Sequence, residues 1–118
     1  MSYKLSVSDQ VVVNVSFSVS DNGKFKPQKF DLICDRVDSS ALMQIVKSED
    51  DVETRLAGMK AKLLDVATGW RGQTLVLEED GTPAAFCSEA LEFMLGIHGV
   101  TALVFNAFAE QVGAKAKN

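Results

Sequence analysis

The sequence of 118 residues has few of the residue types that build metal and redox sites. It contains two cysteines, Cys34 and Cys87, and one histidine, His98. Small secreted disulfide scaffolds use more cysteine, and these two cysteines do not form a Cys-x-x-Cys pair. Because His98 has no cysteine or carboxylate at a metal-ligand spacing, a zinc site is not expected either. We therefore expect no metal and no cofactor.

The sequence also has fewer basic than acidic residues and no long apolar run. The sequence has 12 Lys+Arg against 16 Asp+Glu, a net charge of −4, whereas a nucleic-acid binder needs a basic face. Apolar runs such as residues 102–105 fall far short of the roughly 20 residues that a membrane-spanning helix requires, and the N-terminus has no secretory signal pattern. We expect a soluble intracellular domain that binds neither nucleic acid nor membrane.

The first third of the sequence has the alternation of a β-hairpin. Apolar residues occupy every second position of two segments: Val11, Val13, Val15, Phe17 and Val19, then Phe30, Leu32 and Cys34. A period of two is typical of half-buried strands, and Asn22-Gly23 between them supplies the positive φ angles of a tight turn. The pattern predicts an antiparallel hairpin of roughly residues 9–20 and 26–35. Pro27 belongs in the connection or at a sheet edge.

The rest of the sequence predicts about four helices and one short strand. Asp38 or Ser39 caps a first helix, and the acidic run 48–51 can begin a second, long helix over roughly 50–68, ending near Gly69 or Gly72. Its stripe recurs at steps of three and four: Val52, Leu56, Met59, Leu63, Val66 and Trp70.

Residues 75–77 predict a short third strand, followed by a turn at 78–81. Ser88 is expected to cap a helix that carries Leu91, Met94 and Leu95, and a last helix runs from Val100 to Gly113 after a break at 96–99. The fold class is therefore α+β: an N-terminal antiparallel hairpin plus a short third strand, packed with about four helices. We expect one domain over residues 1–113 and a flexible tail over 114–118.

No residue set in the sequence specifies an enzyme. Cys87 and His98 could be combined into the nucleophile pair of a small hydrolase, but neither lies in a known nucleophile motif. Residues 69–73 lack the third glycine of a phosphate-binding loop, and 78–81 lack the alternating ligands of a calcium loop. We expect a protein that is not an enzyme.

Four residues are candidates for contact with a partner protein: Trp70, Arg71, Phe105 and Phe108. Trp and Arg are enriched at interface hot spots. The alternative is that Trp70 extends the helical stripe into the core, which leaves Arg71 at the surface near the acidic turn. The last helix is apolar over more than one stripe, so it is either central to the core or covered by a partner. This helix is the main indication of self-association, as a homo-oligomer.

The second half of the sequence resembles a family of tail assembly chaperones from long-tailed bacteriophages and prophages. Three segments recur in that order in the family: Trp70-Arg71-Gly72-Gln73, the acidic-Gly-x-Pro turn that ends at Pro83, and the terminus 113–118. The end of the hairpin, Cys34-Asp35-Arg36, also looks like the N-terminal half of these proteins. The resemblance covers most of residues 11–118 and is weakest over 39–62.

The resemblance implies a non-enzymatic morphogenesis factor of the host bacterial cytoplasm. Such proteins bind the long helical tape measure protein, recruit tail tube subunits and are absent from the mature virion. Many also have a longer form made by −1 ribosomal frameshifting, and residues 116–118 could be encoded by the slippery codons GCA AAA AAC. The alternative is a structural tail or head–tail completion protein that is retained in the virion.

Overall fold

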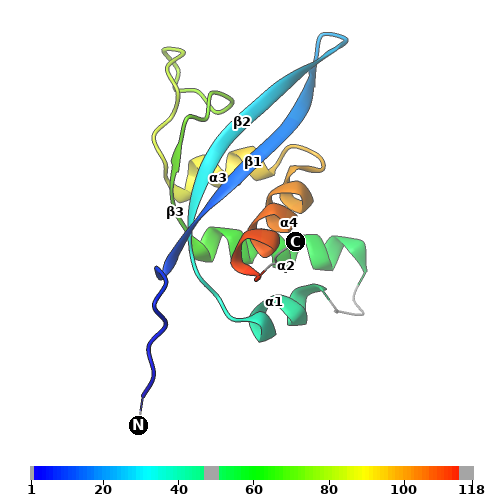
Figure 1. Cartoon of the computed structure of the whole chain (residues 1–118). Coiled ribbons are helices and arrows are strands. Elements are labelled where there is room, and N and C mark those ends of the chain that lie inside the picture. Colours follow the sequence, from blue (N-terminus) through cyan, green and yellow to red (C-terminus); the bar gives the residue numbers. More distant parts are fainter. Residues whose placement is uncertain (1, 47–50, 115–118) are drawn as a thin grey trace, which may run out of the picture.

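The computed structural model describes residues 2–46 and 51–114, in which three strands and four helices form an α+β fold (Figure 1). In chain order these are β1 (Gln10–Asp21), β2 (Lys24–Asp35), α1 (Ser39–Val46), α2 (Val52–Val66), β3 (Ala67–Arg71), α3 (Ser88–Leu95) and α4 (Val100–Val112). The predicted fold class is confirmed. The expected tail at 114–118 lies outside the described residues except for Ala114, which is exposed.

The hairpin forms as predicted. Strands β1 and β2 pair in antiparallel register from Gln10–Asp35 to Asp21–Lys24, and the turn places Asn22 and Gly23 at φ angles of 52° and 84°. The odd-numbered residues of β1 from Val11 to Val19 face the core, while the residues between them are exposed. Pro27 lies within β2 opposite Ser18, in the part of the strand that β3 does not reach.

The third strand is not where the sequence analysis placed it. Residues 67–71 leave helix α2 directly and pair antiparallel with β2, giving the sheet order β1-β2-β3. Residues 75–77 form only one isolated bridge, between Leu77 and Pro83. The predicted long helix was therefore too long at its C-terminal end, because Trp70 continues the helical spacing but pairs with Leu32 in the sheet.

The caps of the helices follow the predicted chemistry with one shift. Asp38 accepts a hydrogen bond from the Ala41 amide at 3.0 Å, and Asp51 accepts one from the Thr54 amide at 2.8 Å. The cap of α3 is Cys87 rather than Ser88, since its Sγ atom accepts from the Ala90 amide at 3.4 Å. Of the acidic run, residues 48–50 lie outside the described part of the chain.

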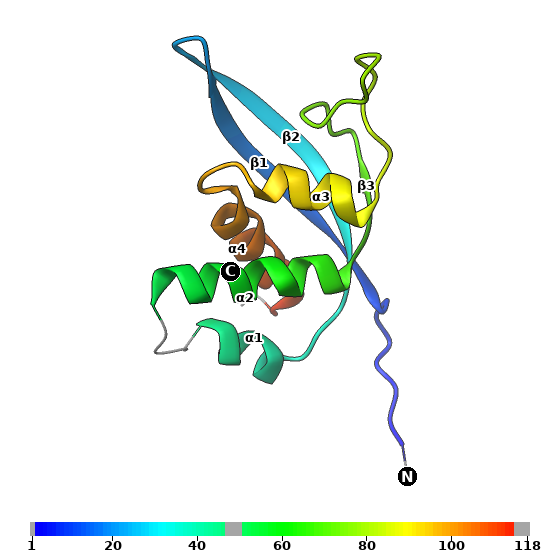
Figure 2. The same cartoon turned by 180° about the vertical axis from the view of Figure 1, so that it is seen from behind.

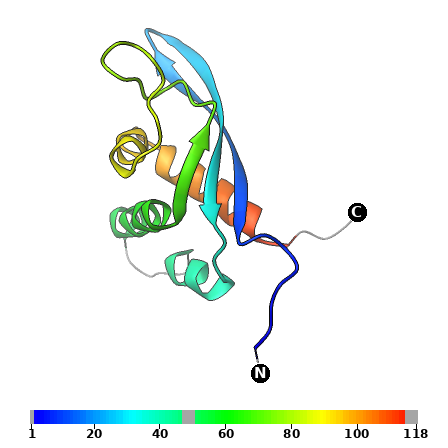
Figure 3. The same cartoon turned by 90° about the vertical axis from the view of Figure 1, so that its left-hand side faces the viewer.

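Helix α4 occupies the centre of the fold, between strand β1 and helix α2. Helices α2 and α4 lie against the sheet, α1 and α3 pack on α2, and the hairpin tip projects beyond the helices (Figures 2 and 3). The core includes fully buried residues from the sheet and from helices α2, α3 and α4: Val13, Leu32, Cys34, Leu63, Leu91, Met94, Val104, Phe105 and Phe108.

Within the described residues, no single helix has the length and apolar composition needed to cross a membrane. Helices α3 and α4 pass that test only when taken together, and they are bent by 113° at the break between them.

Candidate functional site: an apolar groove beside helix α3

The structure removes two of the four predicted contact residues from the surface. Phe105 and Phe108 are 0% exposed, and their rings pack against each other with centroids 6.3 Å apart. The prediction that they contact a partner is wrong for this fold, because the chain itself covers α4 on its apolar sides. Leu103 is the one large apolar side chain of α4 that remains exposed, at 50%.

Trp70 is a packing residue with one polar contact. Its indole lies between two aromatic rings in edge-on geometry, with centroid distances of 6.2 Å to Phe30 and 5.4 Å to Phe86. The Nε1 group donates a hydrogen bond to the Ala84 carbonyl at 3.1 Å. Trp70 thus holds residues 84–86 against the sheet, as the core alternative predicted, although it does so from a strand.

Arg71 lies at the surface, but away from its predicted partner. Its guanidinium is 3.8 Å from the carboxylate of Asp31, the residue opposite it on β2, rather than paired with the acidic turn. With side chains 63% and 39% exposed, this pair contributes little to stability. Arg71 and Trp70 alternate along β3, so the two do not form one contact surface.

Gln73 organises the segment that follows β3. Its side chain is buried and makes four hydrogen bonds with the backbone of the loop. The Oε1 atom accepts from the amides of Leu75 at 3.1 Å and Val76 at 2.9 Å, and Nε2 donates to the carbonyls of Val76 at 2.9 Å and Ala84 at 3.1 Å. The loop between β3 and α3 is therefore a fixed wall, held by one glutamine and one tryptophan.

The far end of this loop closes as a tight turn, as predicted. The Gly81 amide donates to the Glu78 carbonyl at 2.9 Å, and Gly81 has a φ of 88°, in the left-handed region that favours glycine. The Ala84 amide donates to the Val76 carbonyl at 2.9 Å and joins the two sides of the loop. Leu75 and Val76 are thereby held opposite helix α3.

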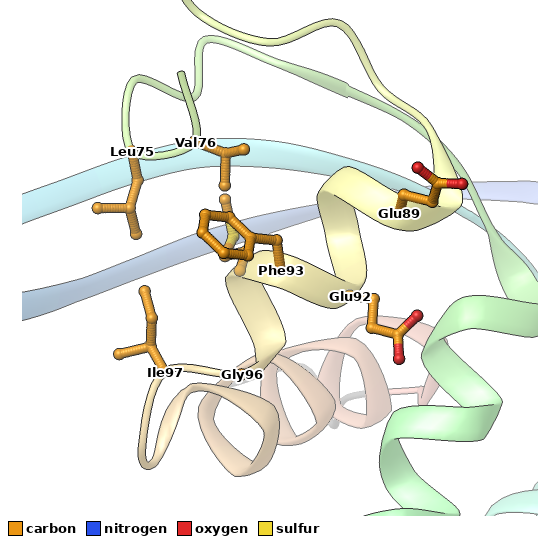
Figure 4. A pocket seen from close by; sticks show the side chains of 8 residues that line it. Leu75, Val76, Glu89, Glu92, Phe93, Gly96 and Ile97 are labelled. Carbon is orange, nitrogen blue, oxygen red and sulfur yellow. The ribbon is translucent and has the colours of Figure 1, made fainter. Parts of the chain in front are cut away.

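Between this wall and helix α3 lies an apolar groove of about 560 Å³ (Figure 4). Its lining includes Leu75 and Val76 from the wall, Phe93 and Gly96 from the end of α3, and Ile97 from the following turn. Figure 4 shows the ring of Phe93 turned toward Leu75 and Val76. Phe93 is 75% exposed, so a large aromatic surface stands in water at the centre of the groove.

The charged groups that line the groove are both carboxylates, Glu89 and Glu92 of helix α3. Glu92 is 3.4 Å from the ammonium group of Lys60 on helix α2. Among the described residues no cation lies within ion-pair distance of Glu89. The rim formed by α3 is therefore acidic, next to an apolar floor.

A second hollow of about 310 Å³ begins on the other side of Ile97. It lies between the hairpin tip and the start of α4, and its lining includes Phe25, Val19 and Leu103. Phe25 is also 75% exposed. Exposed apolar surface thus continues from the groove, around the turn between α3 and α4, to the hairpin.

Cys87 and His98 cannot act as a nucleophile pair in this fold. They lie beyond opposite ends of α3, whose eight residues span about 12 Å, whereas a nucleophile and its base need hydrogen-bond contact. Burial raises the pKa of the Cys34 thiol to about 12, so it stays protonated. No group of three or more His, Cys, Asp or Glu side chains that could hold a metal ion occurs in the described residues.

Sequence analysis missed Phe93 and the structural role of Gln73. Phe93 carries a weak signal: it is two positions from Leu91, about 200° around the helix, and so lies off the buried stripe of α3. Gln73 was named only as a member of the Trp-Arg-Gly-Gln segment; its structural role depends on a loop conformation that no local pattern specifies.

Comparison with family models, curated proteins and solved structures gives no match to this chain.

Proposed function

We propose that this protein is a phage tail assembly chaperone that binds the tape measure protein and recruits tail tube subunits in the bacterial cytoplasm. The observation that carries the proposal is the exposed apolar groove with Phe93 at its centre. A chaperone for a long helical client needs an apolar groove that is open before the client arrives, the helix-in-groove mode of recognition.

The fold connects this groove to the residues that carry the family resemblance. Trp70 and Gln73 belong to the Trp-Arg-Gly-Gln segment, and both donate to the Ala84 carbonyl. The segment and the acidic-Gly-x-Pro turn therefore have a common structural use, which is to fix the groove wall that contains Leu75 and Val76.

The first test is whether a long helical protein is encoded beside this gene, as the proposal predicts; the second is co-expression of that protein with this one. We expect the two proteins to co-purify, the client to become soluble, and the chaperone to be missing from purified virions analysed by mass spectrometry. Phe93→Ala should abolish co-purification. Phe25→Ala is a matched control for exposure and residue type, since both rings are 75% exposed, and should leave co-purification intact.

One result would contradict the proposed function, and another would contradict the assignment of the groove to it. If the protein is present in virions in stoichiometric amounts, it is a structural tail or head–tail component. If Phe93→Ala and wild type co-purify equally with the client, the groove is not the client surface.

A further inference from the structure

We infer that the groove takes an α-helix whose apolar stripe is flanked by lysine or arginine, rather than an extended segment or an acidic helix. This inference rests on the proposed function, in that it names the chemical class of the client segment at the same groove. It is argued from three features of the groove: the backbone of its wall, the shape of α3 and the charge of its rim.

The two wall residues that line the groove, Leu75 and Val76, have no free amide for an extended partner. The amides of Leu75 and Val76 both donate to Oε1 of Gln73, and the Val76 carbonyl accepts from Gln73 and from the Ala84 amide. An extended peptide binds mainly by completing main-chain hydrogen bonds with an open edge, as in strand addition. Because these groups are already paired, the favoured occupant satisfies its own backbone, as a helix does.

The exposed face of α3 is shaped to receive a helix. Glu89, Phe93 and the C-cap residue Gly96 follow one another at intervals of four and three, which places them along one side of the helix. Phe93 provides one large projecting side chain. Gly96 has no side chain, which lets a second helix approach the end of α3 closely.

The rim sets the charge of the occupant. In the part of the chain that the structure describes, the charged residues of the groove lining are Glu89 and Glu92, and Lys60 offsets Glu92 alone. A partner with Lys or Arg beside its apolar stripe pairs with these carboxylates, while one with Asp or Glu there is repelled. The net charge of −4 acts in the same direction at longer range.

The experiment uses the full chain and three synthetic peptides of 18 residues. All have leucine at helical spacing on one face; the first has lysine in the flanking positions, the second has glutamate there, and the third is the lysine peptide with a central proline. Dissociation constants are measured by fluorescence anisotropy at low and high salt. We expect the lysine peptide to bind roughly tenfold tighter than the other two at low salt, with the advantage over the glutamate peptide shrinking as salt is added.

Variants locate the effect in the groove. Phe93→Ala should weaken the lysine peptide roughly tenfold or more, as loss of an aromatic hot spot does, while Phe25→Ala should not. The pair Glu89→Gln and Glu92→Gln should remove the preference for lysine over glutamate. The pair Glu78→Gln and Glu79→Gln, in the exposed turn beyond the Leu77–Pro83 bridge, removes the same two charges and is the control for total charge.

The inference is overturned if the proline peptide binds as well as its parent, if Phe25→Ala weakens binding as much as Phe93→Ala, or if the lysine preference survives loss of both glutamates. Such a result leaves the proposed function standing when Phe93→Ala still abolishes co-purification with the neighbouring helical protein. Conversely, the expected peptide results without co-purification retain the groove chemistry and reject the chaperone function.

Discussion

Replacing Gln73 with methionine tests whether one buried side chain holds the groove wall. Methionine keeps the length and much of the volume of glutamine, so Gln73→Met removes four hydrogen bonds without opening a large cavity. The Val76 carbonyl keeps its bond from the Ala84 amide, and the Ala84 carbonyl keeps its bond from Trp70. The amides of Leu75 and Val76 lose the acceptor that holds them.

The magnitude follows from these two orphaned amides. A buried donor left without a partner costs about 1–3 kcal/mol, and Val76 is buried while Leu75 is half-buried and regains water more easily. We therefore expect Gln73→Met to lower the free energy of unfolding by about 2–4 kcal/mol, a large share of the 5–15 kcal/mol typical of a domain. Gln111→Met, at an exposed position of α4, should change it by less than about 0.5 kcal/mol.

Urea titration with two optical probes measures the effect. Far-UV circular dichroism follows the whole fold, and fluorescence follows Trp70, the only tryptophan in the sequence, which is bonded to the same loop. In Gln73→Met the fluorescence transition should precede the dichroism transition, because the loop loosens first. A loss below about 0.5 kcal/mol with coincident transitions would refute the reasoning that Gln73 fixes the wall.

The substitution Gln73→Glu adds a pH signature. One carboxylate oxygen would keep the two amide donors of Leu75 and Val76, which favours the charged form. Burial and the carbonyl oxygens of Val76 and Ala84 facing the other oxygen outweigh this, so we expect a pKa above the unfolded value of about 4.3. With the folded pKa raised, the stability of the variant is fully present below the unfolded pKa and is lost as pH rises through the folded pKa. A variant whose stability does not fall between pH 4 and 7 would contradict this geometry.

Three further predictions concern the core, the hairpin turn and the thiols. Phe105→Ala should lower the free energy of unfolding, measured in urea, by about 3–5 kcal/mol, because the ring is fully buried. A change near zero would mean that the ring lies at the surface, as the sequence first suggested. Gly23→Ala should lower the free energy of unfolding by about 1 kcal/mol because of the φ of 84° alone, since a Cβ there meets nothing within 4 Å. Gly69→Ala should lower it by less, because Gly69 has an ordinary φ and its Cβ would make only a 3.7 Å contact to a side chain. With Ellman's reagent near pH 8, the exposed Cys87 should react at once and Cys34 only on unfolding. Rapid reaction of both thiols would contradict the burial of Cys34. Because the folded pKa of Cys34 is raised to about 12, the contribution of its thiol to stability should be lost as the pH rises from about 9 toward that value.

Local patterns predicted the elements whose pairing is local. The hairpin followed from alternation and an Asn-Gly turn, because both strands and their connection lie within residues 10–35. The third strand did not, since its pairing with β2 spans more than 30 residues and Trp70 fits the helical stripe as well as the sheet. A spacing of three or four cannot tell the last turn of a helix from the first residues of a strand when the helix ends without a glycine.

The candidate site was predicted in kind but not in position. An exposed apolar surface was expected, yet Phe105 and Phe108 turned out to be core residues because α4 packs between β1 and α2. Burial of an apolar helix depends on what the rest of the chain places around it, which composition does not determine. Phe93 was overlooked because its neighbours Leu91, Met94 and Leu95 supply the buried stripe.

The direct passage from helix α2 to strand β3 has a mechanical consequence. Val66 ends the helix and Ala67 begins the strand, so no slack segment separates them. A rotation of α2 about the sheet must therefore be transmitted to Trp70 and, through its bond to Ala84, to the loop beyond. A force on the outer end of this helix would therefore tilt α2 relative to the sheet and change the width of the groove beside Phe93.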